Sequence, residues 1–220
     1  LKPEEKDAYF LRGSAELELG DYESAKADFD QAISMDPKNY DRLIEIYEAL
    51  AAHGYREVGQ EYLQNVLDTA KQLDAYDSGR IYYYLGEYQK AYLALDEARD
   101  KGGADSYLYL GRAYAATGDY NYASSVYNNY LSKQGPNAEI YNELGLCEMA
   151  KKEYQNALAA FQAGKQIEGN SLMQTLCFNE IVAYEYLEDY QQAEVLMNAY
   201  LQNYPDDQAA IREQQFLSTR

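Results

Sequence analysis

The stretch LGEYQKAYLAL, residues 85–95, decides the fold because its pattern occurs along the whole chain. It places an acidic residue and a tyrosine in succession, an alanine three positions after the tyrosine, and a large apolar residue four positions further on. Four other clear copies are LGDYESAKADF (19–29), TGDYNYASSVY (117–127), KKEYQNALAAF (151–161) and LEDYQQAEVLM (187–197), and a weaker one is HGYREVGQEYL (53–63). Because the copies recur at intervals of 32 to 36 residues, the sequence indicates a tandem repeat rather than a single globule.

Each repeat unit is predicted to contain two helices joined by a turn. Ahead of one copy, Tyr107, Leu110 and Tyr114 recur three and four residues apart, which is the spacing of a buried helical stripe. The predicted units are 6–39, 40–71, 72–103, 104–137, 138–173 and 174–207. Residues 1–5 are expected to form a flexible end, and residues 208–220 a capping helix and tail that cover the last unit.

These repeats resemble the tetratricopeptide repeat family over residues 6–207. The family's small residue at the closest crossing of the paired helices corresponds to Ala25, Gly59, Ala91, Ala123, Ala157 and Ala193. Its large residue four positions later corresponds to Phe29, Leu63, Leu95, Tyr127, Phe161 and Met197. Its first-helix glycine corresponds to Gly13, Gly79, Gly111 and Gly145, whereas Tyr47 and Ile181 replace it in the second and sixth units. The resemblance implies an all-α, right-handed superhelical α-solenoid of stacked antiparallel helix pairs.

The charge of the chain excludes several classes of partner. With 37 acidic and 19 basic residues the formal net charge is −18, so nucleic acid and anionic membrane surfaces would be repelled. No apolar run approaches the roughly 18 residues of a membrane-spanning helix, and none is predicted. The chain has 26 tyrosines and no tryptophan, and its acidic composition is typical of a bacterial repeat protein.

The first residue bears on the cellular location of the protein. The chain begins with Leu1 rather than methionine, so we expect that an upstream segment has been removed. A secretion signal or a lipid anchor would account for such a segment. A cell-surface or secreted location is therefore favoured over a cytoplasmic one.

Residues suited to catalysis or to metal binding are scarce. His53 is the sole histidine and lies at a turn of the weakest repeat, and neither a phosphate-binding glycine loop nor a zinc-ligand spacing occurs. We therefore predict no catalytic residue, no cofactor and no metal site. Cys147 and Cys177 are not expected to form a disulfide, because their offset along neighbouring helices exceeds the roughly 7 Å that a bridge allows.

Repeat register separates the tyrosines into two groups. Framework positions at the turn are occupied by Tyr22, Tyr88, Tyr120, Tyr154 and Tyr190, and a framework position in the first helix by Tyr82, Tyr114 and Tyr184. The framework does not account for Tyr83 and Tyr84. These two tyrosines are candidates for function.

The resemblance implies that the first helices line a concave groove. The residues expected there are Tyr76, Arg80, Tyr83, Tyr84, Leu108, Arg112, Asn142, Phe178, Asn179 and Tyr186. Tyrosine and arginine are the residue types that dominate binding hot spots, which favours a binding surface. In the alternative interpretation, the tyrosines lean on neighbouring helices and the arginines pair with local acids such as Asp77 or Asp105.

A non-catalytic scaffold that binds a protein or peptide in this groove is the favoured function. Arg80 and Arg112 would hold an acidic side chain or a C-terminal carboxylate of the ligand. The family's clamp for chaperone tails is absent, because its positions hold Phe10, Ser14, Glu45, Leu73 and Asp77. Two alternatives stay open. The first is an assembly role in a larger complex, such as one of the cell envelope, through the ends of the array, its convex face or self-association. The second is a carbohydrate-binding surface.

Overall fold

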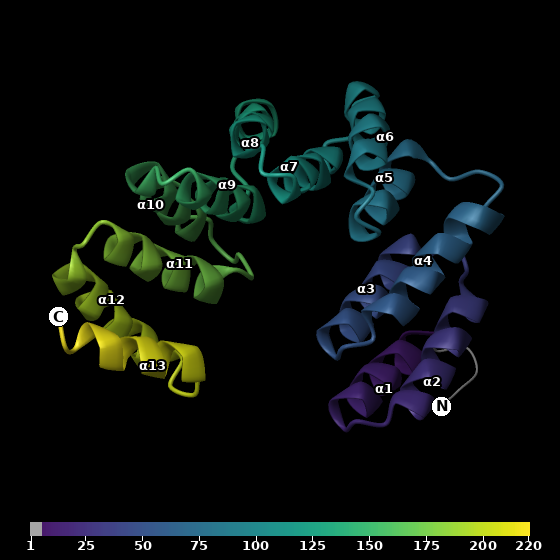
Figure 1. Ribbon diagram of the computed structural model, residues 1–220, viewed down its shortest axis with the longest axis horizontal. Coiled ribbons are helices and arrows are strands. Elements are labelled where there is room, and N and C mark those ends of the chain that lie inside the picture. Colours follow the sequence, from purple (N-terminus) through teal and green to yellow (C-terminus); the bar gives the residue numbers. More distant parts are fainter. Residues whose placement is uncertain (1–5) are drawn as a thin grey trace. The chain divides into compact units, whose positions relative to one another are not determined.

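The computed structural model describes residues 6–220 and contains thirteen α-helices and no strand in that range (Figure 1). Residues 1–5, for which a flexible end is predicted, lie outside the described residues. The helices are α1 (Lys6–Glu18), α2 (Tyr22–Met35), α3 (Tyr40–Ala52), α4 (Arg56–Thr69), α5 (Ala75–Tyr84), α6 (Tyr88–Asp100), α7 (Ser106–Ala116), α8 (Tyr120–Gln134), α9 (Ala138–Ala150), α10 (Tyr154–Lys165), α11 (Met173–Tyr186), α12 (Tyr190–Asn203) and α13 (Gln208–Leu217). The predicted all-α class is confirmed.

Adjacent helices pair and stack within each of two compact units, residues 1–97 and 98–220. In the first unit α1 packs on α2 and α3 on α4, and α3 also contacts α1 and α2. In the second unit the pairs are α7 with α8, α9 with α10 and α11 with α12, and successive pairs meet where α8 contacts α9 and α10 contacts α11. This stacking of helix pairs is the α-solenoid arrangement that the repeats predict.

Three residues connect the helices of each pair, and the middle one adopts a left-handed backbone conformation. This residue is a glycine at Gly20, Gly54, Gly86 and Gly118, and a non-glycine at Lys152 and Glu188. The third residue often caps the following helix: the side chain of Asp119, for example, accepts a hydrogen bond from the backbone N–H of Tyr122. The repeated Gly-acid-Tyr signature is therefore the sequence of the turn and the helix start.

Small residues allow the paired helices to approach closely. A Cβ atom added to Gly145 would lie 2.2 Å from the ring of Phe161, and one added to Gly111 would lie 2.3 Å from the ring of Tyr127. The large residues of the six predicted crossings all have a solvent-exposed fraction of 0%. Each glycine thus makes room for a large side chain of the second helix, as the family pattern predicts.

The second unit of the repeat departs from this pattern without losing its helix pair. Tyr47 of α3 replaces the usual glycine, and a Cβ on Gly59 of α4 would lie 2.9 Å from the Tyr47 ring. Large buried side chains therefore lie on both helices, Tyr47 on α3 and Leu63 on α4, and Gly59 makes room for the Tyr47 ring. In α11, Ile181 replaces the glycine and packs in a buried cluster with Ala193 and Met197.

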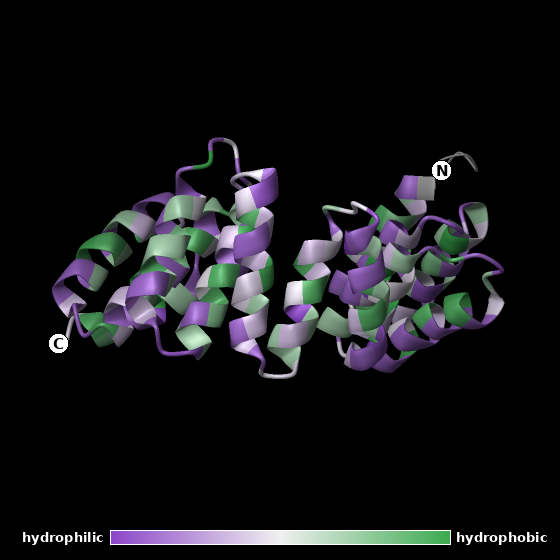
Figure 2. Ribbon diagram, turned by 90° about the horizontal axis from the view of Figure 1, so that it is seen from above, coloured by the Kyte–Doolittle hydropathy of each residue, from purple (hydrophilic) through white to green (hydrophobic). Residues whose placement is uncertain are grey.

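Polar and apolar residues are interspersed along the helices (Figure 2). Green apolar and purple polar residues alternate around individual helices, which is the pattern of helices that are buried on one side. Among the described residues, 6–220, no helix is both long and apolar enough to cross a membrane.

The last helix, α13, packs on the end of the second unit. Ala210 and Leu217 are buried in a cluster with Met197 and Tyr200. Asp207 caps the helix by accepting hydrogen bonds from the backbone N–H groups of its first turn, and its carboxylate also accepts from the hydroxyl of Tyr200 at 2.6 Å. The helix thus covers apolar residues of α11 and α12.

Replacing Lys152 by glycine is expected to stabilise the protein. The backbone φ of Lys152 is 64°, a conformation that costs a residue with a Cβ about 1 kcal/mol or somewhat more, so Lys152→Gly should raise the free energy of unfolding by about 1 kcal/mol in urea denaturation. Lys152→Ala is the matched control, since it removes the lysine side chain and keeps the strain. Equal stabilities for the two variants would contradict the argument.

A pair of carboxyl groups makes the docking of α13 dependent on pH. Burial and the nearby Glu213 of α13 raise the pKa of Glu185 in α11 from 4.5 to about 7. The folded chain therefore binds this proton more tightly than the unfolded chain does. The resulting stabilisation is complete below pH 4.5 and is lost as the pH rises through about 7.

Glu213→Gln should reduce this dependence, because it removes the charge that adds to the effect of burial on the pKa of Glu185. We expect hydrogen exchange of the α13 amides to accelerate, relative to the rest of the chain, between about pH 5 and pH 8 in the natural sequence and to a smaller extent in the variant. Glu194→Gln, an exposed acid of α12, should behave like the natural sequence. The same pH dependence in Glu213→Gln as in the natural sequence would contradict the assignment.

Candidate functional site

Arg80, which the sequence places in the ligand groove, is buried in the first unit with 7% of its surface exposed. Its guanidinium forms ion pairs at 2.5 Å with Asp41 of α3 and Asp77 of α5 and lies 4.4 Å from the ring centre of Tyr76. Burial alone would lower the pKa of Arg80, but the hydrogen bonds to both carboxylates outweigh it and raise that pKa. Arg80 and Tyr76 thus contribute to the contact between α3 and α5.

Arg112 has an equivalent role in the second unit. Its guanidinium, on α7, donates to Glu143 of α9 at 2.7 Å and to Glu139 at 3.0 Å. The alternative interpretation, in which the arginines pair with acids of the chain itself, is confirmed. The suggested partner Asp105 is wrong for Arg112, which pairs with Glu139 and Glu143 instead. Asp105 precedes α7, whereas both glutamates lie on the helix that packs against it.

The remaining candidates of the second unit mostly pack against their neighbours. The amide of Asn179 donates to the side-chain oxygen of Asn142 at 2.9 Å and so links α11 to α9. Leu108 packs on the buried cluster between α8 and α9, and Phe178 meets Tyr200 edge to face at 5.8 Å. Tyr186 is 58% exposed and stacks on Tyr154 at 5.0 Å, which leaves it as the most accessible of these candidates.

Tyr83 and Tyr84 lie together on a cavity of the first unit. The cavity has a volume of about 360 Å³ and is lined by Tyr47, Glu48, Ala51, Arg56, Gln60, Tyr83, Tyr84, Leu85, Gly86 and Tyr88. The ring of Tyr84 lies 5.1 Å from those of both Tyr47 and Tyr83, and Tyr83 lies 6.1 Å from Tyr88. We call this site the tyrosine cavity.

Polar groups at the tyrosine cavity come from α3 and α4. The hydroxyl of Tyr84 donates to Glu48, and the guanidinium of Arg56 donates to the hydroxyl of Tyr47 at 3.2 Å. Arg56 is exposed and forms no ion pair with any acid in the described part of the chain. Sequence reasoning missed Arg56 and Tyr47, and the replacement of the usual glycine by Tyr47 was the available signal.

Reactive side chains elsewhere do not gather into a site. His53 lies with its Nδ1 2.9 Å from the carbonyl oxygen of Ala49, and no group of His, Cys, Asp and Glu within residues 6–220 could hold a metal ion. Cys147 and Cys177 are free thiols. Burial raises the pKa of Cys147 to about 12, so this thiol is unreactive in the folded chain.

Models of known protein families match the repeats of this sequence. One family model of the tetratricopeptide repeat matches residues 6–39, and a second matches residues 76–123 and 110–170. Together the matches cover more than half of the chain. No curated protein matches the sequence.

Several solved structures share the fold. PilW, a type IV pilus biogenesis factor, is 17% identical with a TM-score of 0.66, and the similarity covers 96% of this chain and 97% of PilW. PilF of Pseudomonas aeruginosa is 18% identical with a TM-score of 0.54 and coverages of 98% and 97%. YrrB, described as a TPR protein with an unusual peptide-binding site, is 18% identical with a TM-score of 0.56 and coverages of 85% and 97%.

At these identities the solved structures show the fold alone. The family models, the stacked helix pairs and the small-to-large crossings agree with one another. The chain belongs to the tetratricopeptide repeat family.

Proposed function

We propose that this protein is a non-catalytic scaffold that binds an extended peptide segment of a protein partner, with the tyrosine cavity as a principal contact. Tetratricopeptide repeat proteins generally act as interaction scaffolds, and the structural neighbour YrrB is described as having a peptide-binding site. The observation that carries the proposal is the convergence on one cavity of Tyr83 and Tyr84, the two tyrosines that the repeat framework does not explain.

The walls of the cavity favour one class of ligand side chain. Four tyrosines present aromatic faces and edges, and such surfaces bind apolar or aromatic groups well. A volume of about 360 Å³ accommodates one or two side chains of a peptide. Arg56 adds an exposed positive charge beside the aromatic walls, so an acidic residue next to the inserted side chain would be favoured.

Arg80 and Arg112 were expected to contact the ligand, but their ion pairs within the chain give them a different role in this proposal. Arg80 and Arg112 each contact two carboxylates of the chain, so a ligand carboxylate would have to displace both. We therefore assign to these two arginines the positioning of the helices. The contact with an acidic group of the ligand is assigned to Arg56.

Changing the tyrosine cavity should weaken peptide binding. Peptides selected on the natural sequence from a phage-displayed library should bind the Tyr83→Ala variant at least about tenfold more weakly, measured by fluorescence anisotropy. Tyr122→Ala is the matched control, because Tyr122 is also an accessible tyrosine beside another tyrosine, Tyr114 at 4.2 Å. The proposal fails if no peptide is selected, or if the selected peptides bind Tyr83→Ala as tightly as the natural sequence.

Arg80 and Arg56 should respond differently to substitution. Arg80→Ala leaves Asp77, whose side chain is 17% exposed, without its cation and should lower the free energy of unfolding by about 2 kcal/mol. Arg56→Ala should change stability by less than about 0.5 kcal/mol and should weaken binding of the selected peptides. If Arg80→Ala abolished peptide binding and left the urea midpoint unchanged, the contact with the ligand would belong to Arg80 instead.

A further inference from the structure

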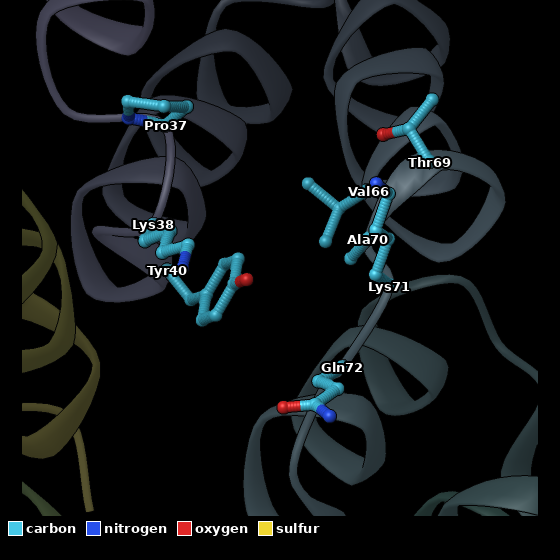
Figure 3. Close-up of a pocket in the computed structure, with 8 residues that line it drawn as sticks. All are labelled: Pro37, Lys38, Tyr40, Val66, Thr69, Ala70, Lys71 and Gln72. Carbon is cyan, nitrogen blue, oxygen red and sulfur yellow. The ribbon is translucent and has the colours of Figure 1, made fainter.

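A second cavity of the first unit, with a volume of about 520 Å³, lies between two inter-helix connections (Figure 3). One wall belongs to the connection between α2 and α3, and the other to the C-terminal end of α4 and the residues that follow it. The lining residues are Pro37, Lys38, Tyr40, Val66, Thr69, Ala70, Lys71 and Gln72. The cavity shares no lining residue with the tyrosine cavity.

The cavity has an apolar interior. Figure 3 shows the ring of Tyr40 extending from α3 toward Val66 and Ala70 on the opposite wall. All three residues are half-buried, and Pro37 adds a further apolar surface. This wall would remove the apolar part of a bound molecule from water.

Three hydrogen-bond donors at the cavity have no partner for their side chains in the described part of the chain. They are the ammonium groups of Lys38 and Lys71 and the hydroxyl of Tyr40. Pairing is common among the other lysines: Lys26, Lys90, Lys151 and Lys165 each form an ion pair with an acid. In a chain with 37 acidic residues, the lining of this cavity contains two lysines and no acid.

Helix polarity adds to the charge on one side of the cavity. Lys38 stands two residues ahead of Tyr40, the first residue of α3, where the helix dipole places a partial positive charge. The lysine and the helix end both favour an anion, and Asp41 in the first turn of α3 offsets part of this effect. Lys71 stands just beyond the C-terminal end of α4, where a cation is itself favoured, so it can remain in place while it contacts a ligand.

We propose that this cavity binds a carboxylate that carries an apolar group. The carboxylate accepts hydrogen bonds from Lys38, Lys71 and the Tyr40 hydroxyl, and the apolar group packs against Val66 and Ala70. Neither part of the ligand suffices alone, since a simple acid gains nothing from the apolar wall. Such a ligand is either the C-terminal residue of a peptide or a free aliphatic acid, which have the same chemistry at this cavity.

Two pairs of probes test the site on the full chain by backbone-amide NMR titration. The pairs are octanoate with octanamide, and the peptide acetyl-Gly-Gly-Leu with a free carboxylate and with an amidated end. We expect both carboxylates, or one of them, to shift the amide signals of Tyr40, Val66 and Ala70, and the matching amides to bind at least about tenfold more weakly. Binding of octanoate alone identifies a free acid as the ligand, and binding of the peptide identifies a C-terminus.

The double variant Lys38→Gln/Lys71→Gln should bind the carboxylate probes at least about tenfold more weakly than the natural sequence. Lys133→Gln/Lys152→Gln, which removes two exposed lysines of the second unit, is the matched control and should bind normally. The proposal is overturned if neither carboxylate shifts these signals at millimolar concentration, if the amides bind equally well, or if the Lys38/Lys71 variant retains full affinity. Tyr83→Ala should bind these probes normally, which separates this result from the test of the tyrosine cavity.

Discussion

The close crossing of paired helices is the constraint on which the rest of this structure depends. At Gly111 and Gly145 a single added carbon would lie within 2.3 Å of the facing aromatic ring, so each pair has room for one large side chain at its centre. At the second pair the space is made on the other helix, where Gly59 of α4 accommodates the ring of Tyr47 of α3. At Gly59, Gly111 and Gly145 a small residue faces a large side chain of the other helix, whereas Ile181 and Met197 of the sixth pair are both large and buried.

Once the helix pairs are set, the scarce cations link them to their neighbours. Arg80 joins α5 to α3 through Asp41 and also pairs with Asp77 of its own helix, and Arg112 joins α7 to α9 through Glu139 and Glu143. These contacts place two acids near each of the two arginines, which offsets part of the repulsion in a chain of net charge −18. Arginine suits this position because its fixed fork donates to two partners at once.

The position of each residue within the repeat predicted the fold well, but it predicted the site only in part. Burial at the crossings follows from local periodicity, so residues such as Phe29 and Phe161 could be placed from the sequence alone. The partners of Arg112 depend on how far a long side chain reaches across to the next first helix, which periodicity does not specify. Tyr83 and Tyr84 could be singled out because the repeat pattern requires no tyrosine at their positions. Arg56 could not, because it lies in the repeat that matches the pattern least well.

The two cavities of the first unit differ in chemistry, and the charge of the chain explains why that matters. A net charge of −18 repels an acidic partner at long range, so negative charge alone cannot attract a ligand. Binding must therefore combine an apolar group, which is indifferent to that field, with a short-range contact to an unpaired cation. Four tyrosines lie beside Arg56 at one cavity, and Val66, Ala70 and the ring of Tyr40 lie beside Lys38 and Lys71 at the other. Under both proposals, the general acidity that repels most anions would make each local cation selective for a ligand that also fits the apolar wall beside it.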